Sequence, residues 1–374
     1  MNNCLIATVN WNDFQKTSRC IKSLINCNSR KCDFLLVDNF SNKNEYSKLL
    51  KFLKIILKKK NIHFQKFNFR NYKNIKIRKK NFFLIKSPLN TGCTGGYNIA
   101  YDFSMYLQYK YICRIDNDCE VSKNFIFKLI NFIDKNQEYV GVNSKVCYLQ
   151  KKKHIQWVGC KLGNNLKIHR PMRIFKKQKS LNEYRPDLNT NNWRGLGETD
   201  FLNGPGSLIS VEALKKSGLA SSDFFYGPED IELSFRLKKF GKLGVLLDSE
   251  IYHEVAQSEN IQLKINNPNG SLRKKLIPER RQYEIYKSYL ILIKKIGSFW
   301  DKLFGYGYFV IKLIFFLLFN YLKFKILFKA MYHFILKKYG EFDLIVNNKN
   351  VNNIHLKVEN YFKILASKKS IYYK

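Results

Sequence analysis

The N-terminal stretch constrains the fold most, because it alternates between strand and helix patterns. Residues 4–9 form an apolar run typical of a buried strand, residues 14–26 carry apolar side chains at helical spacing, and residues 34–37 form a second short apolar run. A strand, a helix and a strand in so short a stretch predict a parallel βαβ unit with a right-handed crossover. We therefore expect an α/β fold with a mostly parallel sheet flanked by helices.

Polar residues follow both predicted strands directly. Asn10 comes after the first strand, and Asp38, Asn39 and Ser41 come after the second. In open α/β sheets, ligands bind outside the carboxyl ends of the strands. The sequence therefore predicts a binding site at this edge of the sheet.

Two aspartates, Asp116 and Asp118, end an apolar run that starts at Tyr111. Alternation along an extended chain places both carboxylates on the same side. Such a pair repels unless a cation lies between its members, and hard divalent cations bind carboxylate and phosphate oxygens together. The pair predicts a metal and phosphate site, although a solvated turn at a strand end is the alternative that it leaves open.

A glycine-rich segment, NTGCTGGYN at residues 90–98, lies between a predicted strand and a predicted helix. Glycines allow close approach of the backbone to a ligand, and free N–H groups can then face a phosphate or a sugar. The segment is neither a GxGxxG fingerprint nor a Walker A loop. A simple turn between strand and helix remains the alternative.

Two further positions carry candidate chemistry. Glu229 and Asp230 follow Pro228 at a predicted helix start, where they either offset the helix dipole or supply a general base for an acceptor hydroxyl. His253 lies beyond the predicted strand at residues 243–247 and is either a structural histidine or a ligand for metal or phosphate.

Composition narrows the partners and the compartment. The chain has 66 Lys and Arg against 29 Asp and Glu, a formal net charge of +37 that attracts nucleic acid, anionic lipid or phosphorylated substrates. Its nine cysteines form no CxxC pair and lie in apolar runs, as in a reducing compartment. No secretory signal pattern is present at the N-terminus, so we expect a cytoplasmic protein.

The C-terminal part predicts attachment to a membrane surface. Residues 309–327 are mostly Phe, Leu and Ile but are interrupted by Lys312, Asn320 and further lysines. This composition favours a peripheral anchor on the anionic inner face of the cell membrane over a spanning helix, and a buried packing helix is the other alternative. We expect a catalytic domain at residues 1–260, with a basic hairpin or flap inserted at 58–81, and a helical membrane-associating region at 261–374.

The order of these motifs resembles the family 2 inverting glycosyltransferases with the GT-A fold. NTGCTGGYN together with FFYGPEDIELSFR at residues 224–236 carries most of the resemblance, which extends from Leu5 to His253. It is strongest to the rhamnosyltransferase-like bacterial branch, which builds cell-surface polysaccharides. The resemblance implies a nucleotide-diphosphate sugar donor, a glycan or lipid-linked acceptor with a hydroxyl nucleophile, and a Mg²⁺ or Mn²⁺ cofactor.

The resemblance also implies a role for each matching position. The catalytic positions are Asp230, as the general base, and its neighbour Glu229. The metal positions are Asp118, Asp116 and His253, with Asp116 also facing the ribose or the donor sugar. Positions on the acceptor side are Gly204 and Arg236, the latter a support for the helix of Asp230. The nucleotide-sugar positions are Thr8, Asn10, Asp38, Asn90, Gly92, Gly96 and Asn98.

Two other classes of protein remain as alternatives. A glycoside hydrolase would use Glu229 with Asp230, or the Asp116 pair, as its acid and base, but this reading does not explain the glycine-rich segment. A nucleic-acid-binding protein would explain the net charge of +37, but no recognised binding motif is present and we expect no specific nucleic acid. The sequence does not identify the sugar, the nucleotide or the linkage.

Overall fold

The computed structural model describes residues 2–29, 32–69, 75–163, 166, 168–169, 193–254 and 279–338. The chain divides into two compact units, which we treat separately. The sheet unit comprises Met1–Lys161, Arg170–Leu219 and Leu233–Val255, and the helical unit comprises Leu162–His169, Ala220–Glu232 and Ala256–Lys374. The predicted domain boundary at residue 260 lies outside the described residues, so it stays a prediction.

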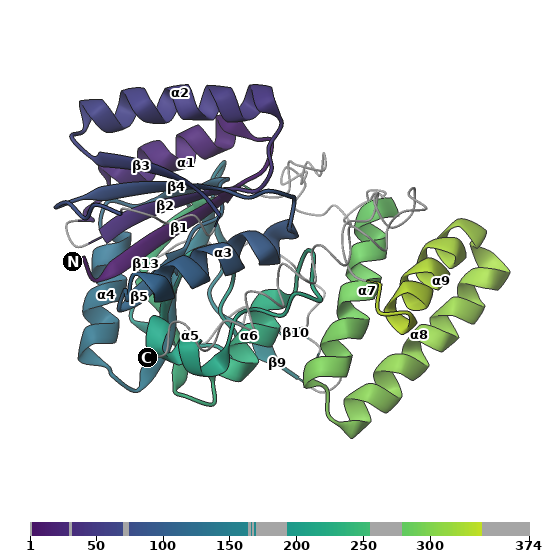
Figure 1. Ribbon diagram of the computed structural model, residues 1–374. Helices are drawn as coiled ribbons and strands as arrows, with labels where there is room; N and C mark the ends of the chain where they lie inside the picture. The colour runs from purple at the N-terminus through teal and green to yellow at the C-terminus, as the bar shows by residue number, and fades with distance from the viewer. Residues whose placement is uncertain are drawn as a thin grey trace. The chain divides into compact units, whose positions relative to one another are not determined.

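An 11-stranded sheet forms the centre of the sheet unit (Figure 1), in the order β11-β13-β7-β12-β5-β1-β2-β4-β3, with β6 paired to β13 and β8 paired to β7. Its strands are β1 (Cys4–Asn10), β2 (Cys32–Asp38), β3 (His63–Asn68), β4 (Asn81–Lys86), β5 (Tyr111–Arg114), β6 (Cys119–Val121), β7 (Tyr139–Tyr148), β8 (Ile155–Trp157), β11 (Leu196–Glu198), β12 (Ser207–Ser210) and β13 (Lys242–His253). The short strands β9 (Lys161–Leu162) and β10 (Ile168–His169) pair separately.

Parallel pairing brings the ends of the first strands together. β1 pairs with both β2 and β5 in parallel, and the register places Asn10 beside Asp38. The strands β2, β4 and β3 continue the parallel part, whereas β12 runs antiparallel between β5 and β7. This arrangement confirms the predicted α/β class with a mostly parallel sheet.

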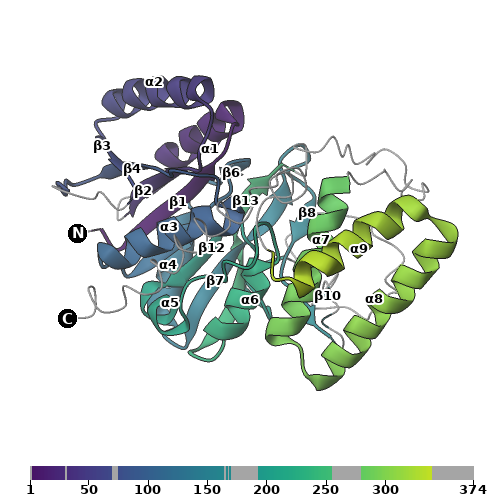
Figure 2. The same ribbon diagram turned by 45° about the vertical axis from the view of Figure 1, so that its right-hand side comes forward.

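Helices cover both faces of this sheet. They are α1 (Phe14–Asn26), α2 (Lys43–Lys59), α3 (Gly92–Tyr106), α4 (Phe125–Lys135) and α5 (Val211–Ser217). On β1, Asn10 bonds to Thr17 of α1, whereas the neighbouring Val9 contacts Gly96 of α3, so α1 and α3 lie on opposite faces. The helix α2 packs on α1, and α3 packs on α5 (Figure 2).

Two local expectations differ from the structure. The basic segment expected to form an inserted hairpin or flap contains β3, an edge strand that pairs in parallel with β4. The glycine-rich segment is mostly helical, because α3 begins at Gly92. The absence of a side chain at Gly96 has a packing reason, since a Cβ there would lie 2.6 Å from Cγ1 of Val9.

The strand β13 is irregular in its middle. It pairs with β7 in parallel, and the register shifts between Leu246 and Glu250, where β13 advances by four residues while β7 advances by one. Before the shift β13 also pairs with β11, and after the shift it pairs with β6. The bulge therefore separates two differently paired halves of one strand.

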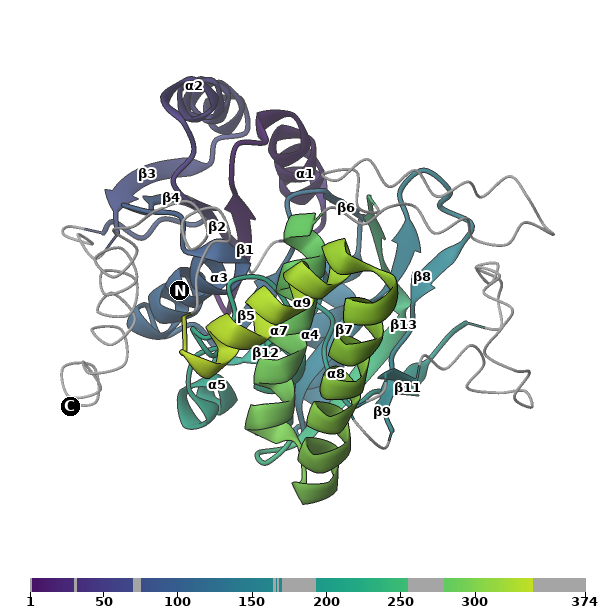
Figure 3. The ribbon, with the colours of Figure 1, turned by 90° about the vertical axis from the view of Figure 1, so that its right-hand side faces the viewer.

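In the helical unit, α7 (Glu279–Ile296), α8 (Phe299–Phe319) and α9 (Tyr321–Ile335) pack on one another (Figure 3). A capping box between Ser298 and Asp301 starts α8. The apolar segment expected as one element is interrupted at Asn320, whose side chain accepts a hydrogen bond from the Lys323 backbone and so caps α9.

Polar side chains lie inside this helical layer. Lys287 is fully buried and its Nζ lies 3.1 Å from Oε2 of Glu284. The hydroxyl of Tyr283 lies 2.8 Å from Nδ1 of His333 on α9, which joins α7 to α9 through a buried hydrogen bond.

Large apolar side chains, by contrast, are exposed along α8 and α9. Ile311 and Leu318 are each 69% exposed and Phe319 is 71% exposed among the described residues. By length and composition α8 could cross a membrane, with a mean hydropathy of 1.7, which is weak support for membrane association.

Candidate active site

A candidate metal centre forms where two strands end. Asp118 lies in the turn between β5 and β6, and His253 is the last residue of β13. Pairing of β6 with β13 places His253 opposite Cys119, and Nε2 of His253 lies 3.3 Å from Oδ1 of Asp118. The backbone N–H of Glu254 also donates to the carbonyl oxygen of Asp118, at 3.2 Å. These contacts fix the predicted metal ligands Asp118 and His253 against each other.

The donor groups fit a hard divalent cation. Asp118, Cys119 and His253 offer ligand atoms within 4.8 Å of one another. Burial raises the pKa of the Cys119 thiol well above its usual value. Sulfur is also a soft ligand, whereas Mg²⁺ and Mn²⁺ prefer oxygen ligands, so Cys119 fits these ions poorly. A carboxylate oxygen and an imidazole nitrogen remain, a pair that Mn²⁺ accepts readily.

The histidine is oriented and charged by its neighbours. The side-chain amide of Gln156 on β8 lies 3.0 Å from Nδ1 of His253, which leaves Nε2 facing Asp118. Burial lowers the pKa of His253, but the hydrogen bond to Asp118 and its negative charge outweigh this, and the pKa is raised. A bound cation would take the place of the imidazole proton.

Asp116 has a different environment from Asp118. Its Oδ1 accepts a hydrogen bond from the Tyr97 hydroxyl at 2.7 Å and lies 3.4 Å from Nε of Arg114. The guanidinium of Arg114 also lies 4.0 Å from the centre of the Tyr97 ring. The buried Tyr97 and Arg114 therefore hold the Asp116 carboxylate, and its predicted roles toward metal and ribose stay predictions.

Gly204 lies against the same arginine. A Cβ at this position would lie 2.6 Å from Nη2 of Arg114, so any larger residue would displace the guanidinium. The close approach explains why glycine suits the position. Its predicted role on the acceptor side stays a prediction.

A buried polar network occupies the ends of β1 and β2. The side-chain amide of Asn10 donates to Oδ1 of Asp38 and to the Ser41 hydroxyl, both at 3.0 Å, and its oxygen accepts from Thr17 at 2.7 Å. Burial raises the pKa of Asp38, and its hydrogen bonds partly oppose the shift. Thr8 is buried on the same strand. The network places the predicted nucleoside residues Thr8, Asn10 and Asp38 in one region.

A second set of hydrogen bonds links β2 to the glycine-rich segment. The side chain of Asn39 donates to the Gly92 carbonyl at 2.9 Å and accepts from the Thr91 hydroxyl at 2.8 Å. Its amide also lies 3.2 Å from Oδ1 of Asn90. Asn98 is buried further along α3. Asn90 and Gly92 thus lie at the strand ends as predicted.

Four residues near the site were not predicted from the sequence: Tyr97, Arg114, Gln156 and Arg19. Arg19 forms an ion pair with Glu254, next to His253, and a second contact of 3.5 Å with Glu120. Tyr97 lies within NTGCTGGYN, but no role was expected for its hydroxyl, and Arg19 and Gln156 lie in no recognised motif. Arg114 gave a further signal, as a charged residue inside an otherwise apolar strand run.

Glu229 and Asp230 lie in the first turn of α6 (Glu229–Leu237), in the part of this helix that belongs to the helical unit. Glu229 is buried, and Oδ1 of Asp230 lies 2.8 Å from the Ile231 backbone nitrogen. Arg236, later in α6, donates to the carbonyls of Gly218 and Leu219 at 3.1 and 2.8 Å. Their catalytic and supporting roles stay predictions.

The family model of glycosyl transferase family 2 matches residues 5–186. This match confirms the predicted resemblance to the family 2 glycosyltransferases, although it does not single out the rhamnosyltransferase-like branch. No match was found among curated proteins.

Several solved glycosyltransferase structures are similar to this chain. GalNAc-T7 with UDP, GalNAc and Mn²⁺ has a TM-score of 0.52 at 14% identity over 80% of this chain and 49% of its own. A Pyrobaculum calidifontis mannosyltransferase with GDP-Man and Mn²⁺ has a TM-score of 0.49 at 10% identity, over 99% of this chain and 81% of its own. S. aureus TarS 1–349 with UDP has a TM-score of 0.45 at 14% identity, over 78% of this chain and 65% of its own. The chain spans about half the length of GalNAc-T7. The similarity of the two structures, with a TM-score of 0.52, supports the GT-A fold.

Proposed function

We propose that the protein transfers a sugar from a nucleotide-diphosphate donor to a hydroxyl group of a glycan or a lipid-linked acceptor. The observation that carries this proposal is the Asp118–His253 pair, at 3.3 Å, of which Asp118 lies within residues 5–186 that match the family 2 model. A hydrolase or a nucleic-acid binder gives no reason for the turn of Asp118 to be tied, through a hydrogen bond from Asn117 to Thr17, to the buried network of Asn10 and Asp38.

In the proposed reaction the donor lies along the ends of β1, β2 and β5. Asn10 and Asp38 bind the nucleoside, and Asp118 with His253 holds a Mg²⁺ or Mn²⁺ ion. When bound, this ion supplies Lewis-acid stabilisation for the leaving diphosphate. The UDP and Mn²⁺ in the GalNAc-T7 structure support a donor and a cofactor of this kind.

Asp230 acts as the general base in this proposal. Its carboxylate takes the proton of the acceptor hydroxyl while that oxygen bonds to the anomeric carbon, and the bond from this carbon to the diphosphate breaks on the opposite face. A single displacement of this kind inverts the anomeric configuration. Glu229 lies beside the base, and Arg236 holds the following turn of the helix.

The test is donor turnover by the full chain. A panel of nucleotide-diphosphate sugars should give Mn²⁺- or Mg²⁺-dependent release of nucleoside diphosphate that a chelator abolishes. Asp118→Asn should lower this rate by about 100-fold or more, since loss even of a residue behind a metal ligand costs 10- to 100-fold. Asp134→Asn, the same exchange at the end of α4, is the matched control. Equal rates for Asp118→Asn and the control would contradict the proposal.

We also propose that α8 and α9 attach the protein peripherally to an anionic membrane surface, on the cytoplasmic inner face. The exposed apolar side chains of both helices and the intervening lysines support this attachment. Deletion of residues 306–374 should release the protein from the membrane fraction. Continued sedimentation of the shortened protein with membranes would contradict the attachment.

A further inference from the structure

The candidate metal centre lies at the ends of two chain segments, so its geometry depends on the groups that fix those ends. Asp118 lies in the turn before β6, and His253 is the last residue of β13. A metal site needs its ligands held within about 0.5 Å of the productive geometry. The contacts that hold these two segments therefore bear on the affinity for a divalent cation.

The helix α1 holds the first of these segments. The Thr17 hydroxyl accepts a hydrogen bond from the side chain of Asn117 at 3.0 Å, and the Ser23 hydroxyl accepts one from the Val121 backbone at 3.3 Å. Thr17 itself donates to the side chain of Asn10 on β1, at 2.7 Å. The helix is thus fixed to the sheet and supports the turn between β5 and β6 on both sides.

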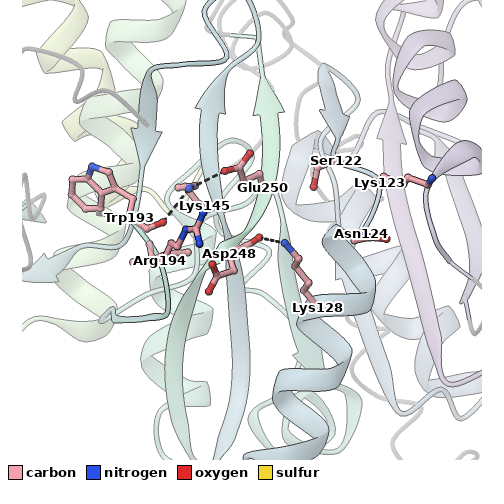
Figure 4. Close-up of a pocket in the computed structure, with 10 residues that line it drawn as sticks. Ser122, Lys123, Asn124, Lys128, Lys145, Trp193, Arg194, Asp248 and Glu250 are labelled. Carbon is pink, nitrogen blue, oxygen red and sulfur yellow. Dashed lines mark hydrogen bonds and ion pairs between the residues drawn. The ribbon is translucent and has the colours of Figure 1, made fainter. Parts of the chain in front are cut away.

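The ion pair in the middle of β13 does not hold the second segment. Oε1 of Glu250 lies 2.9 Å from Nζ of Lys145 on β7, in the wall of a cavity of about 470 Å³ (Figure 4). Glu250 and His253 are three residues apart, so their side chains lie on opposite faces of the strand. The Lys145–Glu250 pair therefore stabilises the strand but not the position of the imidazole.

Arg19 of α1 joins the segments of both ligands. Its guanidinium forms an ion pair with Glu254, the residue after His253, and its Nε lies 3.5 Å from Oε1 of Glu120, two residues after Asp118. The Glu254 side chain is only 6% exposed, and within the described part of the chain Arg19 is the one cation that pairs with it. The Glu254 backbone N–H also donates to the Asp118 carbonyl at 3.2 Å. Arg19 therefore fixes the chain just beyond each ligand.

The charge of Arg19 has an opposite effect, since a cation near the centre repels a bound Mn²⁺. Its side chain is 38% exposed, so solvent screens this repulsion, and the two paired carboxylates offset it further. Loss of the guanidinium, by contrast, leaves the Glu254 carboxylate buried without its cation, which is strongly unfavourable. We expect the chain that carries His253 to shift as a result, so positioning outweighs repulsion.

We propose that Arg19 is a positioning residue of the candidate metal centre, which acts through Glu254 to keep His253 against Asp118. Arg19 binds neither the ion nor the donor. Its role rests on the metal centre of the proposed function and extends that centre to α1, a helix in which the sequence indicated no site residue.

The experiment is titration of the full, metal-free chain with Mn²⁺ alone, followed by the electron paramagnetic resonance signal of free Mn²⁺. Arg19→Gln and Glu254→Gln should each weaken binding by about 10-fold or more, because loss of a residue behind a metal ligand costs 10- to 100-fold. If Arg19 acts through Glu254, Arg19→Gln should cause no further loss in the Glu254→Gln background. Lys22→Gln removes an exposed charge three residues further along α1 and should bind Mn²⁺ as the unaltered protein does.

Donor turnover gives a second measurement. In Arg19→Gln the apparent KM for Mn²⁺ should rise by about 10-fold, whereas kcat at saturating Mn²⁺ and the urea unfolding midpoint should stay near those of the unaltered protein. A general loss of structure would lower both kcat and the midpoint, and would contradict a positioning role.

Two results of the Mn²⁺ titration would also overturn the proposal. One is unchanged or tighter binding by Arg19→Gln, and the other is an equal loss from Arg19→Gln in the presence and absence of the Glu254 carboxylate. Either result would leave the transferase function standing if donor turnover is found. If no donor is turned over, the Mn²⁺ titrations still support or overturn the role of Arg19.

Discussion

The sheet unit and the helices α7–α9 distribute polar and apolar side chains in opposite ways. The sheet unit buries its apolar strands and collects its polar side chains at the strand ends, around Asn10, Asp38 and Asp118. The helices α7–α9 instead bury the polar groups of Glu284 and Lys287 and expose apolar residues outward. The first pattern is typical of a soluble enzyme, whereas the second suits a surface that meets lipid.

The two patterns fit the separate tasks that we propose for catalysis and for membrane attachment. If the strand ends of the sheet unit and Asp230 of α6 carry the chemistry and α8 with α9 carries the attachment, each task can be lost without the other. Exchanges of single residues in each region would test this separation.

Removal of the proposed base should stop the chemistry and leave the attachment intact. We expect Asp230→Asn to lower kcat by about 10²- to 10⁴-fold, the usual contribution of a general base. The apparent affinity for Mn²⁺ and the binding to anionic vesicles should not change. Steady-state kinetics and vesicle sedimentation measure these, with Glu212→Gln as an exposed control. Full activity in Asp230→Asn would show that another residue is the base.

Disruption of the buried ion pair should unfold the helices rather than affect the chemistry. Lys287→Ala leaves Glu284 buried without its cation, which costs about 3–5 kcal/mol of unfolding free energy. Urea unfolding followed by circular dichroism measures this loss, with the exposed Lys294→Ala as the control. The double exchange of Glu284 and Lys287 to Met should recover most of the stability. A loss below about 1 kcal/mol in Lys287→Ala would argue that the pair is not buried in solution.

A polar residue on the exposed face of α8 should weaken the attachment. Burial of one leucine side chain contributes about 1.5–3 kcal/mol, so Leu318→Asn should reduce vesicle binding by about 10- to 100-fold. Donor turnover in solution should stay the same. The matched control is Phe127→Asn, an exposed apolar residue of α4 in the sheet unit. Equal vesicle binding by both variants would contradict the proposed membrane-binding face.

The smallest effect concerns the pH dependence of the helical region. Burial, with the nearby charge of Lys287, lowers the pKa of His333 to about 4. An unfolded histidine titrates near pH 6.5, so the unfolded chain takes up a proton that the folded chain refuses. The stability that this group contributes is therefore fully present above about pH 6.5 and is lost as the pH drops toward 4. A plot of the urea unfolding midpoint against pH should be flatter for His333→Asn than for the unaltered protein. Parallel curves for the two proteins would contradict the assignment of this pH dependence to His333.

The sequence predicted the parallel sheet because strand ends and polar residues coincided at Asn10 and Asp38. It did not predict β3, because an edge strand with one exposed face carries polar and basic residues such as Lys66, which look like a surface insertion. The break at Asn320 was also missed, although asparagine is a good helix cap, because the surrounding Phe and Leu run dominated the pattern.

The candidate metal centre was partly predictable. Asp118 and His253 follow apolar runs and match the family motifs, so both could be named from the sequence. Their contact depends on the pairing of β6 with β13, and the support from Gln156 depends on the pairing of β8 with β7. Such long-range pairings leave no signal in the local sequence pattern, which is why Gln156 was missed.

The irregularity in β13 acts as a spacer that sets which way the end of the strand faces. Side chains alternate along a strand, so an odd number of extra residues reverses the alternation relative to β7. The three extra residues between Leu246 and Glu250 therefore decide that His253, and not Tyr252, faces Asp118. A change of one residue in the length of this segment would move the imidazole to the opposite face of the sheet. The proposed metal site therefore depends on the length of a segment that contains none of its predicted ligands.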